Sequence, residues 1–162
     1  MRNLGYFYLL LLTLSCAKLE EKHTIVKIDL KSLNDEKIQF FYTNNEIKYF
    51  TDELMFANKI EGSTQFQTVE FKLPKDFRLN RLRIDLGENK LETPIYIRNI
   101  NISYGNKIIE IDEKTMNRFF STNIYLKTSD FVIFERSYIA KKYDPFLKST
   151  ALLEKKMFLE FR

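Results

Sequence analysis

Residues 79–111 read LNRLRIDLGENKLETPIYIRNINISYGNKIIEI, and the other predicted elements are arranged around this stretch. In its first part, apolar residues at 82, 84 and 86 alternate with charged residues at 81, 83 and 85. Successive side chains of a β-strand point to opposite faces, so this segment presents one apolar and one charged face. Residues 95–104 repeat the alternation, and a Gly105-Asn106 turn leads to another apolar run at 108–111. The stretch predicts the middle of an antiparallel sheet.

Apolar alternation and short apolar runs extend this pattern along the chain. They predict further strands at 24–31, 38–42, 46–50, 65–74, 123–126, 131–134 and 157–161, with a shorter segment and turn at 58–63. The apolar phase slips by one residue between Phe66 and Val69, and it slips again at Arg98-Asn99. A slip of this kind is typical of a β-bulge.

One short helix is predicted among the strands. Asp112 is suited to the N-cap, and Met116, Phe119 and Phe120 follow at helical spacing. Residues 149–156 allow a further helical turn. About nine or ten short strands, separated by turn signals, are typical of sandwich architectures. We therefore predict an all-β fold, an antiparallel two-sheet β-sandwich or jelly roll with one short helical insertion.

Composition indicates one globular domain with a mixed-charge surface. The chain has 162 residues, of which 44% are hydrophobic and 15% aromatic, so it can bury one well-packed core. The formal net charge is +4, but acidic and basic residues are interleaved. This arrangement indicates a solvated surface rather than a polyanion-binding block, and we predict no nucleic-acid partner.

The N-terminus has the pattern of an export signal. Arg2 precedes an uncharged apolar run at 4–14, which is too short to span a bilayer. The segment Leu12-Thr13-Leu14-Ser15-Cys16, at the end of this run, resembles the lipobox of bacterial lipoproteins, although Thr13 stands where that motif usually has Leu. The resemblance implies cleavage before Cys16 and acylation of its side chain. A plain secretory signal with an incidental cysteine is the alternative.

This resemblance sets the expected organisation and location. Residues 1–15 would be the signal peptide, 16–23 a tether from the lipidated Cys16, and 24–162 a single sandwich domain. The membrane would be a partner through the lipid anchor, and an anchor with more than one acyl chain is lasting. Ala17 rather than Asp follows Cys16, which by resemblance to sorted lipoproteins implies the outer membrane of a bacterial envelope.

Residues that usually carry catalysis are scarce. The only histidine, His23, falls in the expected tether, and no glycine-rich phosphate loop is present. The carboxylates that a glycosidase pair would need are available, but no pattern marks two of them as close: Asp52, Glu53, Asp85, Glu88 and Glu92. We predict no enzyme and no cofactor. Residues 85–89 could offer oxygens to a structural calcium ion, but a simple turn is the favoured interpretation.

Aromatic residues on predicted strands remain as candidate binding residues. A sugar stacks its C–H face on an aromatic ring while nearby polar side chains bind its hydroxyls. The carbohydrate-binding candidates are Tyr42, Tyr49, Arg83, Asp85, Tyr96, Arg98 and Tyr104. For each tyrosine the alternative is a ring that caps the core with its hydroxyl in solvent.

Several of these strand segments carry a family resemblance. The segments 38–42, 50–53, 71–74, 79–85 and 97–102 resemble β-sandwich domains appended to bacterial surface-polysaccharide glycosyltransferases, which are akin to galactose-binding-like carbohydrate-binding modules. In the Leu-Arg-Ile-Asp segment, Leu86 stands where proline usually follows the Asp. The resemblance implies a non-enzymatic envelope lipoprotein that binds glycan or accompanies polysaccharide. The alternative is a structural lipoprotein that docks on another envelope protein.

Overall fold

The computed structural model describes residues 22–47, 49–89 and 93–162. Its elements are, in chain order, β1 (His23–Ser32), β2 (Glu36–Thr43), the 3-10 helix η2 (Asp52–Leu54), β3 (Met55–Ile60), β4 (Gln67–Lys75), β5 (Arg81–Leu86), β6 (Ile95–Tyr104), β7 (Lys107–Asp112), α2 (Met116–Phe119), β8 (Phe120–Thr122), β9 (Leu126–Lys127), β10 (Ile133–Arg136), β11 (Phe146–Ser149) and α3 (Ala151–Glu160). Strand β1 already includes His23, the last residue of the expected tether, and Cys16 lies outside the described residues.

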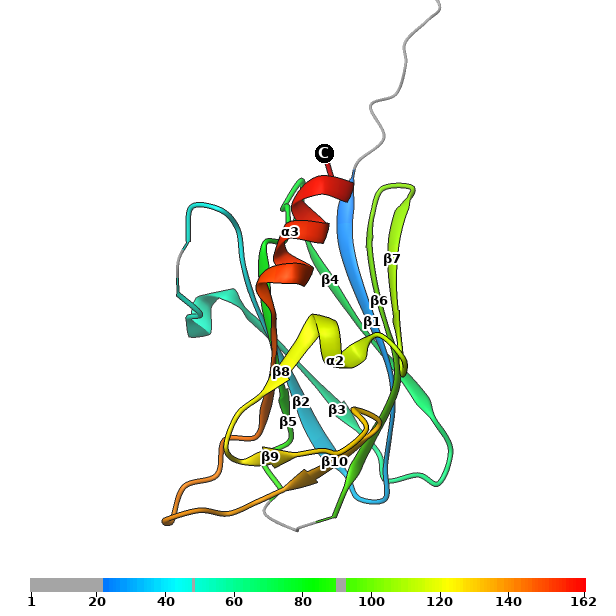
Figure 1. The fold of residues 1–162 in the computed structure, drawn as a ribbon, viewed down its shortest axis with the longest axis vertical. Helices are drawn as coiled ribbons and strands as arrows, with labels where there is room; N and C mark the ends of the chain where they lie inside the picture. Colours follow the sequence, from blue (N-terminus) through cyan, green and yellow to red (C-terminus); the bar gives the residue numbers. More distant parts are fainter. Residues whose placement is uncertain (1–21, 48, 90–92) are drawn as a thin grey trace, which may run out of the picture.

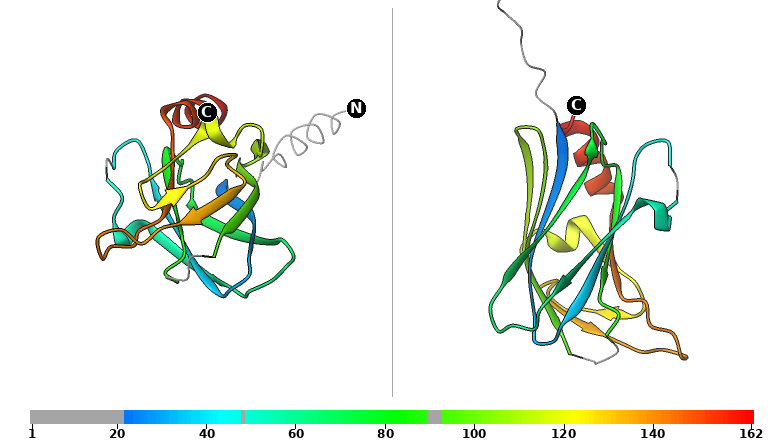
Figure 2. Two further views of the ribbon diagram at one scale, coloured as in Figure 1. Left: turned by 60° about the horizontal axis from the view of Figure 1, so that its bottom comes forward. Right: turned by 180° about the vertical axis from the view of Figure 1, so that it is seen from behind.

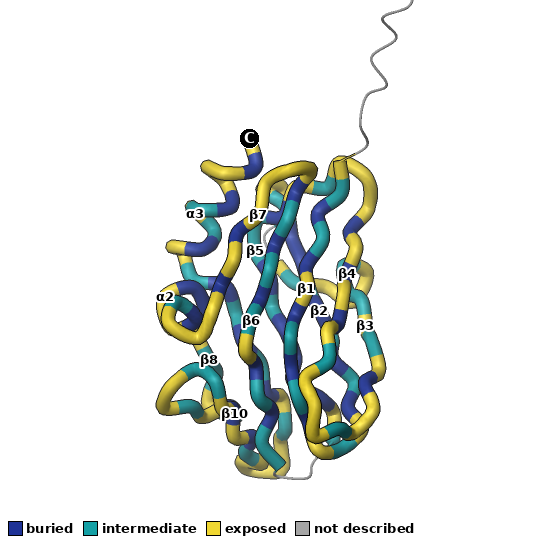
Figure 3. The backbone as a smooth tube through the Cα atoms, turned by 90° about the vertical axis from the view of Figure 1, so that its right-hand side faces the viewer, coloured by how far each residue is buried: buried dark blue, intermediate teal, exposed yellow. Residues whose placement is uncertain are grey.

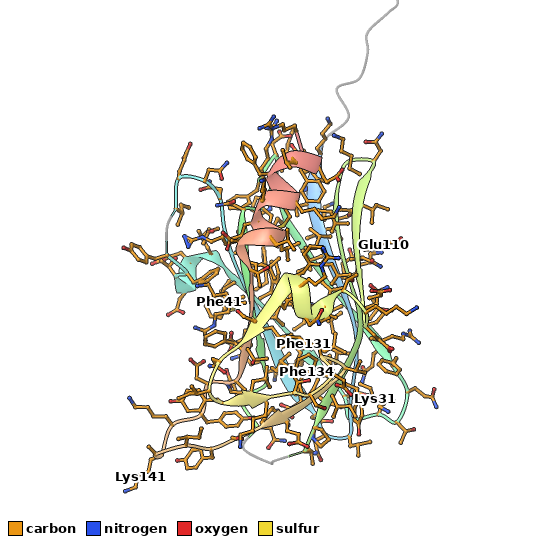
Figure 4. All side chains as sticks on the ribbon, in the orientation of Figure 1. Lys31, Phe41, Glu110, Phe131, Phe134 and Lys141 are labelled. Carbon is orange, nitrogen blue, oxygen red and sulfur yellow. The ribbon has the colours of Figure 1, made fainter. Side chains whose placement is uncertain are left out.

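Two antiparallel sheets face each other (Figure 1). Sheet A has the order β4-β1-β6-β10-β9, and β7 also pairs with β6. Sheet B has the order β3-β2-β5-β11-β8. Side chains in Figure 4 lie on both outer faces, with Lys31 labelled on the side of sheet A and Phe41 on the side of sheet B. The predicted all-β, two-sheet sandwich is confirmed.

Alternation along the strands places the apolar side chains between the sheets. In β5, for example, Leu82, Ile84 and Leu86 are fully buried, whereas Arg81 and Arg83 lie on the outer side. Figure 3 shows the same alternation of buried and more exposed residues along β1 and β6. Full burial of one large apolar side chain stabilises a fold by about 1.5–3 kcal/mol, so this shared core is the main source of stability.

The predicted bulge in β6 is confirmed. Asp29 of β1 pairs with Asn99 of β6, but the next residue, Leu30, pairs with Ile97, which leaves Arg98 as the extra residue. The other predicted bulge, between Phe66 and Val69, is wrong. Phe66 precedes β4, and from Gln67 onward the pairing of β4 with β1 is regular up to residue 72. The apparent slip marks the start of the strand.

The strand predicted at 157–161 is wrong, because these residues belong to α3 and its C-cap. The Thr150 side chain caps this helix by accepting a hydrogen bond from the backbone N–H of Leu153. Leu153, Met157 and Phe161 are buried at a spacing of four residues. Apolar residues four apart fit a helical stripe as well as alternate positions of a strand, so the alternation at 157–161 was ambiguous.

Other element boundaries also differ from the prediction. The described residues between 46 and 50 form a loop, and the single strand expected at 123–126 is replaced by the flanking strands β8 and β9. The helix predicted after Asp112 is the single turn α2. Its N-cap is Thr115, while the Asp112 carboxylate closes the preceding turn by accepting from the Thr115 N–H at 3.1 Å.

Candidate functional site

The structure separates the seven predicted binding residues into different environments. Tyr42 is 4% exposed and Tyr104 is 6% exposed, so both rings belong to the core. Tyr42 stacks on Phe56 with a centroid distance of 5.3 Å, and Tyr104 packs 6.0 Å from Phe161. Each of the two rings therefore packs against another aromatic ring. Tyr49 is 78% exposed in the loop between β2 and η2, on the side of sheet B.

Arg83 and Asp85 form a structural cluster on the outer side of sheet B. Arg83 Nε and Nη2 donate to the two Asp85 oxygens at 2.6 and 2.7 Å, and Nη2 also donates to Asp144 at 2.5 Å. The guanidinium carbon lies 3.9 Å from the centroid of the Phe146 ring. Burial raises the pKa of Asp85 above its usual value, and the neighbouring Arg83 opposes that rise. These contacts join β5 to the start of β11 and the residues just before it, and they leave Arg83 little capacity for a ligand.

Tyr96 and Arg98 lie together on the outer face of sheet A. Tyr96 is the cross-strand partner of Lys31, whose Nζ lies 4.1 Å from the centroid of the Tyr96 ring. The same Nζ is 5.4 Å from the Phe66 ring, which is 36% exposed. Distances within about 6 Å are typical of cation–π contacts. One lysine thus lies against two aromatic rings.

Arg98 extends this group, because it lies two residues after Tyr96 on the same face of β6. Its guanidinium carbon lies 4.6 Å from the Phe66 centroid, and Nη2 lies 3.4 Å from an Asp29 oxygen. The other Asp29 oxygen accepts from the Thr68 hydroxyl at 2.6 Å. We call this group the sheet A patch, and it consists of Asp29, Lys31, Phe66, Thr68, Tyr96 and Arg98.

A shallow hollow adjoins the sheet A patch. It has a volume of about 230 Å³ and is lined by Arg98, Asn99, Asp112, Glu113 and Lys114. Within the described part of the chain, the side-chain oxygens of Asn99 and Asn101 are buried without a hydrogen-bond partner. The hydrogen bond from the Thr115 hydroxyl lowers the pKa of Asp112 below its usual value, so Asp112 is an anion at neutral pH. Aromatic rings, cations and hydrogen-bonding groups therefore share one surface.

A larger groove lies elsewhere, where β2 begins and β3 ends. It has a volume of about 690 Å³ and is lined by Asp35, Glu36, Lys37, Lys59, Ile60, Glu61, Glu88 and Asn89. Beneath it Glu36 Oε1 lies 2.6 Å from Arg136 Nη2, and both side chains are fully buried. Burial raises the pKa of Glu36, and the hydrogen bond and charge of Arg136 oppose that rise. Arg136 also donates to the carbonyl oxygens of Leu86 and Thr93, so the pair fastens β10 to the ends of β2 and β5.

The Glu36–Arg136 pair was not predicted from the sequence, although a signal for it was present. Glu36 shares its strand face with Ile38 and Phe40, and Arg136 shares its face with Phe134. Opposite charges at inward positions of two strands indicate a buried ion pair, because an unpaired buried charge is very unfavourable.

The carboxylates considered for catalysis are dispersed. Asp85 is bound to Arg83, and Glu88 forms an ion pair with Lys37 at 2.7 Å. Asp52 and Glu53 lie on the exposed helix η2, and Glu92 lies outside the described residues. His23 Nδ1 lies 3.0 Å from the Leu73 carbonyl oxygen within the β1–β4 pair. Among the residues described, no three His, Cys, Asp or Glu side chains gather as metal ligands would.

Two further observations concern membrane-spanning helices and similarity to known proteins. In the described ranges, no helix has the length and hydropathy needed to cross a membrane. A comparison with protein-family models finds no match, and a search of curated proteins finds no similar sequence.

Proposed function

We propose that the chain is a bacterial envelope lipoprotein, anchored in the outer membrane through acylated Cys16, whose sandwich domain binds a glycan without catalysing a reaction. The observation that carries the binding proposal is the sheet A patch, where Tyr96 and Phe66 lie beside Lys31, Arg98 and Asp29. The lipobox-like sequence that ends at Cys16 supports the anchor.

The contacts within the patch indicate how a sugar would bind. Phe66 and Tyr96 offer apolar ring surface for a sugar C–H face, and Asp29 and Arg98 offer groups that bind hydroxyls in pairs. Lys31 and Arg98 already lie against these rings as cations. A glycan with carboxylate or phosphate groups would replace their present contacts with stronger, charge-assisted hydrogen bonds. The patch therefore fits an acidic polysaccharide better than a neutral one.

Affinity electrophoresis tests the glycan proposal. The domain from Lys18 onward would be run through gels that contain the source organism's surface polysaccharide or a panel of plant and host glycans. We expect retardation that Tyr96→Ala and Phe66→Ala abolish, with circular dichroism showing that both variants stay folded. Tyr49→Ala is the matched control, because Tyr49 is an exposed tyrosine outside the patch, and it should migrate like the wild type.

An absence of retardation in every gel would overturn glycan binding and favour the second candidate, docking on another envelope protein. A specific observation supports that candidate. Ile133 of β10 is paired with Tyr96 and is 38% exposed, so the patch continues into an apolar side chain at the neighbouring strand. Cross-linking in membranes through a photoreactive residue at Ile133 would then identify the partner.

The anchor is tested separately. Cys16→Ser should abolish incorporation of labelled fatty acid and move the protein from the detergent phase to the aqueous phase. Unchanged partitioning of Cys16→Ser would overturn the lipoprotein assignment, and it would leave the glycan experiment unaffected.

A further inference from the structure

We propose that the end of the sandwich at which β1 begins rests on the membrane, and that the outward face of α3 docks there on anionic lipid headgroups. The inference rests on the proposed anchor at Cys16, since that anchor decides which end of the domain is held near a bilayer. Three features carry it: the composition of the outward face of α3, the basic residues around it, and the short chain between Cys16 and β1.

The outward face of α3 combines apolar and basic side chains. A helix turns by about 100° per residue, so the face opposite the buried Leu153, Met157 and Phe161 can be read from the sequence. That face carries Leu152, Phe158 and Leu159, which are 44%, 49% and 51% exposed, together with Lys155. Arg162 follows the helix, and its guanidinium carbon lies 4.4 Å from the centroid of the Phe158 ring. The two acidic residues of α3, Glu154 and Glu160, lie on the flanks of that face. Exposed apolar side chains of this kind can enter the headgroup region, and the basic side chains beside them are attracted to anionic lipid.

More basic residues surround the C-terminal end of α3. Tyr104, which packs on Phe161, lies 5.9 Å from the Lys22 ammonium and 5.9 Å from the Arg78 guanidinium. Lys107 Nζ donates to the Arg162 carbonyl oxygen at 3.3 Å. Asp76, whose N–H binds the Lys22 carbonyl, is an acidic residue at the same end. Cations nevertheless predominate at this end, which suits it to an anionic lipid surface.

This end is also where the chain would approach the membrane. Figure 1 and the right-hand view of Figure 2 show the C-terminal end of α3 beside the start of β1. Only six residue steps separate Cys16 from Lys22, and an extended chain spans at most about 3.6 Å per step. An acylated Cys16 would therefore hold this end within about 20 Å of the bilayer surface. The anchor would thus place the face of α3 close to lipid.

A fluorescence experiment tests the inference without the anchor. The chain has no tryptophan, so Phe158→Trp on α3 is a unique reporter. The domain from Lys18 onward is suitable, because the buried apolar residues of the described part form one cluster within 26–161. With vesicles of phosphatidylcholine and phosphatidylglycerol, we expect a blue shift of the emission and quenching by brominated acyl chains. Lys155→Glu together with Arg162→Glu should weaken this binding at least tenfold.

Tyr49→Trp is the control, since this site is also exposed but lies in the β2–η2 loop, and its emission should not shift. Leu159→Trp provides a second reporter if Phe158→Trp does not fold. No shift from either α3 reporter, or an equal shift with phosphatidylcholine alone, would overturn the inference. A shift that depends on protein concentration without vesicles would overturn it as well, because a second copy would then cover α3. Failure here is distinct from failure of acylation, which the Cys16→Ser experiment reports.

Discussion

At the scale of single residues, Arg83 shows how an outward-facing side chain can be structural. Alternation alone assigns it to the solvent side of β5 and predicts that its removal is mild. In the folded chain it binds Asp85 and Asp144 and lies on the Phe146 ring. Asp85 is 8% exposed, so its carboxylate depends on this partner.

We expect Arg83→Ala to lower the free energy of unfolding by about 1–3 kcal/mol, because it leaves a largely buried carboxylate with fewer hydrogen bonds. Urea unfolding of the purified domain measures the change. Arg98→Ala is the matched control, since its side chain is 53% exposed on the outer face of sheet A, and it should cost less than about 0.5 kcal/mol. Equal losses for the two variants would contradict the structural role of Arg83.

We expect substitutions at Glu36 and Arg136 to have non-additive effects on the free energy of unfolding. Glu36→Ala should cost about 3–5 kcal/mol, because it leaves a guanidinium buried without its counterion. Glu36→Met with Arg136→Met should be more stable than either single methionine variant, since the double change removes both charges and keeps most of the volume. Thermal unfolding of the three methionine variants measures the coupling. Losses that simply add would show that the pair does not act as a unit.

Gly87 belongs to the same arrangement. Its φ is +89°, and a Cβ at this position would lie 2.0 Å from Glu36 Oε2 and 2.7 Å from Arg136 Nη1. The glycine therefore allows the backbone after β5 to pass close to the ion pair.

At the scale of elements, the connection between β10 and β11 contains an unfavourable turn. Ile139 and Lys142 are bridged to each other, and the two residues between them have positive φ, 49° at Ala140 and 63° at Lys141. Two-residue hairpin turns of this kind favour Asn-Gly, because most L-residues are strained there.

Replacing Ala140 by Asn and Lys141 by Gly should therefore stabilise the domain, by about 1 kcal/mol. The melting temperature of the double variant measures the gain. Lys142→Gly is the control, because Lys142 is not among the residues with positive φ, and it should give no gain. A melting temperature for the double variant at or below that of the wild type would contradict the turn geometry.

Strands with one buried face were the elements that the sequence predicted well. The alternation in β1, β5 and β6 is long enough to exclude a helix, and even the bulge at Arg98 left a visible slip. Residues 46–50 alternate as well, but those of them that the structure describes form a loop that pairs with no strand. A local sequence pattern does not show whether a neighbouring strand is present, because that depends on the arrangement of the whole sheet.

The candidate site was predictable only in part, for the same reason. Tyr96 and Arg98 were identified from their strand face, and the register of Ile100 and Ile102 could also have assigned Tyr104 to the core. Lys31 and Phe66 were not among the predicted binding residues. They come close to Tyr96 and Arg98 only because β1 pairs with both β6 and β4. Such pairing joins residues far apart in the chain, and no local pattern encodes it.

At the scale of the whole molecule, the two proposed surfaces are compatible. His23 and Lys31 lie near opposite ends of β1, and eight residue steps along a strand correspond to about 25 Å. The membrane-facing end is at His23, whereas the sheet A patch is at Lys31. A domain anchored and docked through α3 would therefore still present its patch away from the bilayer.

Helix α3 also joins the two sheets, and this role gives a test of the whole arrangement. Phe161, its C-cap, packs on Tyr104 of sheet A, while Ser149 at the end of β11 precedes it in sheet B. The Thr150 hydroxyl donates a hydrogen bond to the carbonyl oxygen of Arg118, which belongs to α2. This hydrogen bond fixes the start of α3 against α2. The buried side of α3 thus closes the sandwich at the end where β1 begins.

Two neighbouring leucines make this closure measurable. Leu153 is fully buried and Leu152 is 44% exposed, so the same change to alanine should give opposite results. Leu153→Ala should cost about 2–5 kcal/mol, because it leaves a cavity between α3 and the sheets, and Leu152→Ala should cost less than about 0.5 kcal/mol. Urea unfolding measures both. Leu159→Ala distinguishes a helix from a strand at this position. In a strand, Leu159 would share the buried face of Met157 and Phe161. On α3 it is 51% exposed, so Leu159→Ala should lower the free energy of unfolding as little as Leu152→Ala does.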